Sequence, residues 1–203
     1  MSDRQLILAS SSIYRRGLLE RLQRPFACVS PDIDEAPLLN ELPAATAMRL
    51  ARLKSQAVAA AYPRDLIISS DQVAELEGPP DAAGITLGKP GNHANAVLQL
   101  RAMRGKRVAF HTAVCLLDAA SGRRQLENVV TTVHFRDAGN LTDAQIDRYL
   151  QLEQPYDCAG SAKIECLGIV LAHKIECDDP TAIIGLPLIS LVTMLKREGV
   201  EVI

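Results

Sequence analysis

The chain has 203 residues, and its 22 lysine and arginine residues nearly balance 24 aspartate and glutamate residues. With 48% hydrophobic residues, a chain of this length can bury a core without disulfides or a structural metal. The net charge is near neutral, and no basic run is longer than the pairs Arg15-Arg16 and Arg123-Arg124, which argues against a surface that binds long nucleic acid. If the chain binds a nucleic-acid component, we expect a monomeric nucleotide.

The hydrophobic pattern alternates between strand-like and helix-like segments. We expect strands at 6–9, 26–30, 66–68, 108–117, 129–135 and 166–173, and helices at 15–22, 44–62, 93–103, 141–152 and 187–198. A turn at 120–122 predicts a long hairpin, and the glycines and prolines of 78–90 predict a loop. We expect the Thr142 hydroxyl to cap the helix at 141–152, because it can accept from an unpaired backbone amide. Alternating strands and helices with one antiparallel excursion indicate an α/β class with a mixed sheet, in a single domain over 1–203 that has two lobes.

No apolar run approaches the roughly 20 residues that a membrane span needs, and the N-terminus lacks the layout of a signal peptide. We therefore expect a soluble, cytoplasmic protein. The five cysteines form no Cys-x-x-Cys pair, which favours buried free thiols over a metal site or a disulfide framework.

The first candidate site is the segment from Ser10 to Arg16, which follows a predicted strand and opens a helix. Its hydroxyls, loop amides and two guanidinium groups are suited to binding phosphate oxygens. An N-cap serine followed by a solvated helix face is the commoner meaning of the same residues, and the segment lacks the glycines of a P-loop.

Carboxylates form the second and third candidates. Asp71 is expected at the end of the strand that begins at Leu66, where it could activate water or hold a divalent cation, or simply cap the next turn. Asp32, Asp34 and Glu35 offer oxygen ligands for Mg²⁺ or Mn²⁺, although a solvated acidic loop is the commoner meaning of such a cluster.

Two lysines complete the candidates: Lys54 in the alanine-rich helix and Lys89 between a glycine and a proline. Either residue could be an ordinary surface lysine. Together with the acids, they match what metal-assisted attack of water on a polyphosphate needs, namely a base, metal ligands and cations.

Taken in order, these residues resemble the Maf family of nucleoside triphosphate pyrophosphatases, and the resemblance covers nearly the whole chain. The segments that carry it are Leu6–Ser12 with Arg15-Arg16, Asp32–Glu35, Lys54, Ser70-Asp71-Gln72, Gly88-Lys89-Pro90, His111-Thr112, Cys158–Ser161 and Gly185–Leu188. Within the family, the chain is similar to the branch of 7-methyl-GTP pyrophosphatases.

The resemblance implies a two-lobed fold related to inosine triphosphate pyrophosphatases, with an elongated mixed sheet, flanking helices and a cleft. It also implies cleavage between the α- and β-phosphates with a divalent cation, Mg²⁺ or Mn²⁺, and a homodimer. The site residues that it implies are Asp71 as proton acceptor, Ser10, Arg15, Glu35, Lys54 and Lys89 around phosphate and metal, and Tyr14, Gln72 and Glu165 at the base.

Two other functions stay open at this stage. One is a pyrophosphatase for pyrimidine nucleotides such as dTTP or UTP. The other is a regulatory binding protein, because Maf relatives have been associated with restraint of cell division. The set of Asp71, Lys89 and Glu35 favours an enzyme, since an adaptor has no need for acids and bases of this kind.

Overall fold

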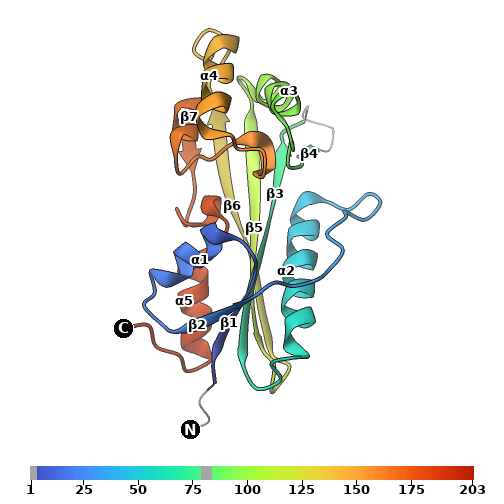
Figure 1. Cartoon of the computed structure of the whole chain (residues 1–203), viewed down its shortest axis with the longest axis vertical. Helices are drawn as coiled ribbons and strands as arrows, with labels where there is room; N and C mark the ends of the chain where they lie inside the picture. The colour runs from blue at the N-terminus through green and yellow to red at the C-terminus, as the bar shows by residue number, and fades with distance from the viewer. Residues whose placement is uncertain (1–3, 79–83) are drawn as a thin grey trace. The chain divides into compact units, whose positions relative to one another are not determined.

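The structure of the chain is a computed structural model that describes residues 4–78 and 84–203. Within these ranges it contains five α-helices, seven β-strands and three short 3₁₀ helices (Figure 1). In chain order the helices and strands are β1 (Leu6–Ala9), α1 (Ile13–Glu20), β2 (Phe26–Val29), α2 (Pro43–Ala59), β3 (Leu66–Leu76), β4 (Ile85–Leu87), α3 (His93–Met103), β5 (Arg107–Asp118), β6 (Arg124–Phe135), α4 (Asp143–Glu153), β7 (Ala172–Glu176) and α5 (Leu188–Arg197).

The strands form one mixed sheet in the order β2-β1-β3-β5-β6-β7, with β4 paired to β3. Strand β1 is parallel to both β2 and β3, whereas β4 and β7 pair antiparallel with β3 and β6. The turn predicted at 120–122 joins β5 to β6, as expected. The predicted α/β class with a mixed sheet is therefore confirmed.

The elements divide into two compact units. The described part of unit 1 comprises residues 4–72, 112–129 and 179–203, and that of unit 2 comprises 73–78, 84–111 and 130–178. Strands β3, β5 and β6 each contribute residues to both units.

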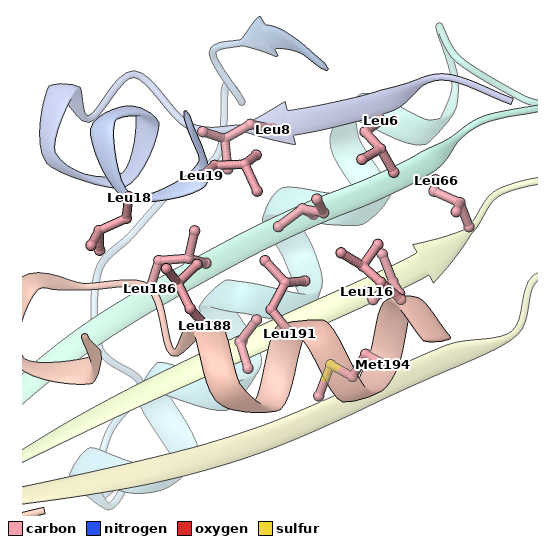
Figure 2. Packing of buried hydrophobic residues seen from close by; sticks show 13 residues of the cluster. Leu6, Leu8, Leu18, Leu19, Leu66, Leu116, Leu186, Leu188, Leu191 and Met194 are labelled. Carbon is pink, nitrogen blue, oxygen red and sulfur yellow. The ribbon is translucent and has the colours of Figure 1, made fainter. Parts of the chain in front are cut away.

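Unit 1 buries both faces of its parallel strands, because side chains alternate along a strand. Leu6, Leu8, Leu66 and Ile68 pack with leucines of α1 and α5 on one face (Figure 2). On the other face, Ile7, Ala9 and Ile67 pack with Val58 of α2. Continuous apolar runs such as Leu6–Ala9 follow from this burial on two sides.

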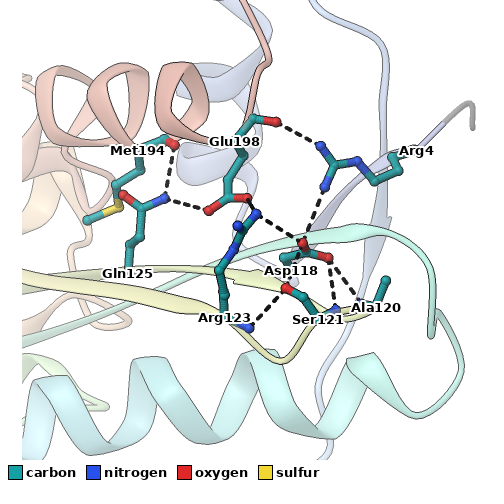
Figure 3. Close-up of polar contacts among 8 residues, drawn as sticks. All are labelled: Arg4, Asp118, Ala120, Ser121, Arg123, Gln125, Met194 and Glu198. Atoms are coloured by element: carbon teal, nitrogen blue, oxygen red, sulfur yellow. Dashed lines mark hydrogen bonds and ion pairs between the residues drawn. The ribbon is translucent and has the colours of Figure 1, made fainter. Parts of the chain in front are cut away.

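A polar network closes the end of unit 1 where the N-terminal segment, the β5–β6 turn and the end of α5 meet (Figure 3). Arg4 donates to the Glu198 carbonyl at 2.7 Å and pairs with Asp118 at 3.3 Å, while Arg123 pairs with Glu198 at 2.6 Å. Asp118 also accepts from the Ser121 hydroxyl at 2.8 Å. The network supplies partners for two nearly buried carboxylates, Asp118 and Glu198.

Unit 2 packs α3 and α4 with short 3₁₀ helices, η1 (Ala159–Ser161) and η2 (Leu167–Leu171). The buried Tyr149 of α4 links these parts, since its hydroxyl donates to the Ser161 carbonyl at 3.3 Å and accepts from the Lys163 amide at 3.0 Å. Helix α4 begins with the predicted Thr142 cap, which forms a full capping box with Gln145.

Two predicted segments of unit 2 need correction. The strand expected at 166–173 is wrong over most of its length, because Leu167–Leu171 forms η2 and β7 starts only at Ala172. The amides of Cys166 and Gly168 both bond to the Lys163 carbonyl, which curls this apolar stretch. The loop expected at 78–90 contains the short strand β4, and its residues 79–83 lie outside the described residues.

Helix α5 offers a test of the core. Leu191 is fully buried, whereas Ile189 on the same helix is 58% exposed. We expect Leu191→Ala to lower the free energy of unfolding by about 2–5 kcal/mol, because it leaves a cavity under β1 and β3. Ile189→Ala is the control and should change it by no more than about 0.5 kcal/mol. Urea denaturation of both variants measures the difference, and equal losses would contradict this view of the core.

Candidate active site

Strand β3 directs four consecutive polar side chains to its two sides. Ser69 donates to the Ala51 carbonyl at 2.6 Å and Asp71 pairs with Lys54, so both side chains point toward α2. Ser70 and Gln72 point the other way and bond to the 182–185 turn before α5. The expectation that Asp71 ends its strand is wrong, since β3 continues to Leu76. Asp71 is therefore held in mid-strand, with rigid backbone on both sides.

Lys54 brings two predicted carboxylates together. Its ammonium nitrogen lies 2.6 Å from Asp71 Oδ1 and 2.9 Å from Glu35 Oε1. The side chains of Lys54 and Asp71 are only 5% and 8% exposed, but that of Glu35 is 52% exposed. The cluster thus has two buried members and one that faces solvent.

Burial raises the pKa of the Asp71 carboxyl above its ordinary value. The positive charges of Lys54 and Arg15 act against this rise, and the negative charge of Glu35 adds to it. A carboxylate of raised pKa is a stronger base than an exposed aspartate.

Arg15 lies in the first helical turn of α1, just after the serine-rich loop. Ser12 caps the helix by accepting from the Arg15 amide at 3.3 Å, and the hydroxyl of the buried Ser10 accepts from the Ser12 amide at 3.1 Å. The Arg15 Nε atom donates to the Gly185 carbonyl at 2.9 Å. Desolvation lowers the pKa of its guanidinium, against the opposing effect of Asp71 and Glu35. The N-cap that the sequence offered as one alternative is therefore present at Ser12, and the Arg15 guanidinium is held by Gly185.

The 182–185 turn is a part of the site that sequence reasoning missed. Besides Arg15, its Gly185 carbonyl accepts from the Ser70 hydroxyl at 2.7 Å, and its Ala182 carbonyl accepts from Thr112 at 3.0 Å. The turn acts through backbone oxygens, which residue types do not reveal. The sequence pointed to this turn only through the segment Gly185–Leu188, which is one of those that carry the family resemblance. In the structure, Gly185 adopts a φ of +119°.

Gln72 is fixed by the same turn. Its amide nitrogen lies 3.0–3.1 Å from Thr112 Oγ1 and from the carbonyl oxygens of Ala182 and Ile183. These acceptors engage both hydrogens of the amide group, so the nitrogen faces the turn. Any bond from Gln72 to a ligand would then use its oxygen. Tyr14, the other base-site candidate of this unit, is the second residue of α1 and is partly exposed.

Lys89 and Glu165 belong to unit 2. Lys89 is exposed, and its segment is anchored because the Gly88 carbonyl accepts from Gln99 Nε2 at 3.0 Å and from the Gly160 amide at 3.3 Å. Glu165 precedes η2 and is also exposed. Desolvation raises the pKa of its carboxyl, Lys163 opposes this rise and Glu153 adds to it.

No group of three or more His, Cys, Asp or Glu side chains that could hold a metal ion occurs among residues 4–78 and 84–203. The donors that converge are the carboxylates of Glu35 and Asp71, on either side of one ammonium group. Mg²⁺ is commonly held by one or two carboxylates together with phosphate oxygens of a substrate. The donor set therefore fits a cation that a polyphosphate helps to bind.

Comparison with known proteins shows the family. A model described as Maf-like protein matches residues 5–198, and the chain belongs to this family. The resemblance inferred from the sequence is confirmed.

Several relatives carry a more particular name, 7-methyl-GTP pyrophosphatase. The relative from Cupriavidus metallidurans is 55% identical over 194 residues, which are 96% of this chain and 93% of the relative. That from Nitrosospira multiformis is 56% identical over 199 residues, which are 98% of this chain and 96% of the relative.

Among solved structures, the Ham1 protein of Staphylococcus aureus matches 66% of this chain and 73% of its own, at 16% identity and a TM-score of 0.47.

None of the helices in the described residues has the length and apolar character that a membrane span requires.

Gly185 provides a test of the turn. A Cβ atom there would lie 3.3 Å from Arg15 Nε, and the positive φ disfavours any L side chain. We expect Gly185→Ala to lower the free energy of unfolding by about 1–3 kcal/mol. Gly17→Ala is a control of opposite sign, because nothing lies within 4 Å of the new Cβ and alanine favours the helix by roughly 0.5–1 kcal/mol. Denaturation curves that show no loss for Gly185→Ala would contradict the strain assigned to the turn.

Proposed function

We propose that the chain is a nucleoside triphosphate pyrophosphatase that hydrolyses the bond between the α- and β-phosphates of 7-methyl-GTP, giving the monophosphate and pyrophosphate. The observation that carries the proposal is the mid-strand Asp71 paired with Lys54, in a chain whose relatives of that name are about 55% identical over nearly their full length. The reacting water would lose its proton to Asp71 as pyrophosphate leaves.

Each remaining site residue has a role in this proposal. Glu35 and Asp71 would hold a divalent cation, Mg²⁺ or Mn²⁺, which when bound neutralises charge on the phosphate oxygens. Lys54 would favour the ionised form of Asp71, since its positive charge opposes the rise in pKa that burial causes. Ser10, Arg15 and Lys89 would bind phosphate oxygens, Arg15 by the guanidinium nitrogens that Gly185 does not use.

The base would be recognised by Tyr14, Gln72 and Glu165. Methylation at N7 makes guanine cationic, and an aromatic face with a nearby carboxylate favours a cationic base. Gln72 would accept from the base edge through its amide oxygen, because its nitrogen is bonded to the 182–185 turn. As further parts of the proposal, the chain would work in the cytoplasm as one domain over 1–203, as a homodimer, and without polymeric nucleic acid.

Asp71→Asn tests the base. The amide has nearly the same shape but accepts no proton, so turnover of 7-methyl-GTP should fall by about 10²–10⁴ while the circular dichroism spectrum stays unchanged. Asp178→Asn changes an exposed aspartate and serves as the matched control. Release of pyrophosphate measures both variants, with Mg²⁺, with Mn²⁺ and with excess EDTA. Wild-type turnover by Asp71→Asn would exclude Asp71 as the base, and full activity in EDTA would exclude the cation.

Glu165→Gln tests recognition of the methylated base. The carboxylate is exposed in this structure, and an exposed ion pair is worth up to about 1 kcal/mol, which is about fivefold in kcat/KM. We expect a loss of up to this size for 7-methyl-GTP and a smaller loss for GTP, with no change for the exposed control Glu127→Gln. Equal losses for both nucleotides, or faster turnover of dTTP or UTP by the wild-type chain, would move the substrate away from 7-methyl-GTP.

A further inference from the structure

The segment that carries Glu35 has little of its own to hold it in place. Residues 30–42 connect β2 to α2 without helix or strand, and most of them are exposed. Leu38, Leu39 and Leu42 are between 59% and 93% exposed, so hydrophobic burial does not order the segment. The pair between Lys54 and the half-exposed Glu35 is of a kind that contributes weakly by itself. A further contact that holds the segment therefore bears directly on the position of Glu35.

Arg49 of α2 makes that contact through Glu41. Its Nε and Nη2 atoms each lie 2.7 Å from a different oxygen of the Glu41 carboxylate, which is a bidentate pair. The two side chains are only 15% and 10% exposed. The bond from Arg49 lowers the pKa of Glu41 to about 2, so the carboxylate stays ionised. Glu41 in turn accepts from Thr46 Oγ1 at 2.9 Å and from the Leu38 amide at 3.1 Å.

Arg49 also reaches the residue next to Glu35. Its Nη2 atom donates to the Ala36 carbonyl at 3.0 Å, while the Ala36 amide donates to Asp34 at 2.9 Å. The backbone that follows Glu35 is thus tied to α2 by Arg49, and the Glu35 carboxylate meets Lys54 of the same helix. One rigid helix therefore sets both the path of the segment and the position of its functional carboxylate.

We propose that Arg49 is a positioning residue that, through Ala36 and Glu41, holds the Glu35 carboxylate beside Lys54 and Asp71 for the divalent cation. The part of this inference that concerns the cation rests on the proposed function. Lysine cannot replace Arg49, because a single ammonium group does not bridge both Glu41 oxygens and the Ala36 carbonyl.

Hydrogen–deuterium exchange tests the ordering of the segment without any reaction. The amides of Ala36, Leu38 and Glu41 all donate hydrogen bonds within the segment, and they should exchange faster in Arg49→Ala and Arg49→Lys than in wild type. Arg52→Ala changes an exposed arginine of the same helix and should leave their exchange unchanged. Glu41→Gln keeps the shape of the side chain and removes the ion pair from the other end, so it provides a second variant if Arg49→Ala folds poorly.

A double-mutant cycle tests whether Arg49 acts through Glu35. Loss of a residue that orients a metal ligand typically weakens metal binding about 10- to 100-fold, and we expect Arg49→Ala to raise the Mn²⁺ concentration for half-maximal pyrophosphate release by a factor in this range. In a Glu35→Gln background the same substitution should change it less than about twofold, because coupled residues are not additive. Arg52→Ala should have no effect in either background.

Three results would overturn the inference: unchanged amide exchange in Arg49→Ala, an unchanged Mn²⁺ requirement, or equal effects with and without Glu35. Failure of the proposed function is distinguishable from these. If wild-type protein released no pyrophosphate from any nucleoside triphosphate, that function would fail, while amide exchange would still show whether Arg49 orders the residues around Glu35.

Discussion

Burying Asp71 in the middle of β3 is the constraint on which the rest of the site depends. A carboxylate inside a sheet is unfavourable unless a cation and hydrogen bonds compensate it. Lys54 meets this requirement at 2.6 Å, and this fixes the distance and rotation of α2 relative to the strand. Ser69, which bonds to the Ala51 carbonyl, holds the same helix two residues earlier along β3. The contact between Lys54 and Asp71 therefore serves both the packing of α2 on β3 and the compensation of the Asp71 charge.

Because side chains alternate along a β-strand, the polar residues of β3 are held by two different supports, α2 and the 182–185 turn. Side chains that leave β3 toward α2 meet charged groups, whereas those on the opposite side meet backbone carbonyls of the 182–185 turn. The first support places the Lys54 ammonium group against Asp71. The second holds Ser70, Gln72 and Arg15 by neutral acceptors that do not change with pH. Arg15 couples the two supports, because its positive charge also opposes the rise in the pKa of Asp71.

Much of this arrangement could be predicted from the sequence, for reasons that can be named. Helix α3 has the predicted bounds, and the Thr142 cap of α4 was identified, because periodicity and capping are local properties. The strand β3 was predicted too short, since Ser69, Ser70 and Asp71 look like a loop until their partners on α2 and the turn are known. The segment 167–171 was predicted as part of a strand, because an apolar run does not reveal that the Cys166 and Gly168 amides bond to the Lys163 carbonyl. The candidate site residues were predicted from their order along the chain, whereas Arg49 and the carbonyls of 182–185 make tertiary contacts that no local pattern contains.

The division of the chain into units has a consequence for its biosynthesis. Unit 1 draws on residues near both ends of the chain, and its core joins leucines of β1 and α1 to leucines of α5. On a ribosome, β1, α1 and β3 are synthesised well before α5. The apolar face that they share with α5 therefore stays uncovered by that helix while unit 2 is synthesised. The described residues of unit 2 lie between these segments in the sequence, interrupted by residues 112–129 of unit 1. Unit 1 therefore cannot complete its core before unit 2 has been synthesised, unlike the common pattern in which the N-terminal unit folds first.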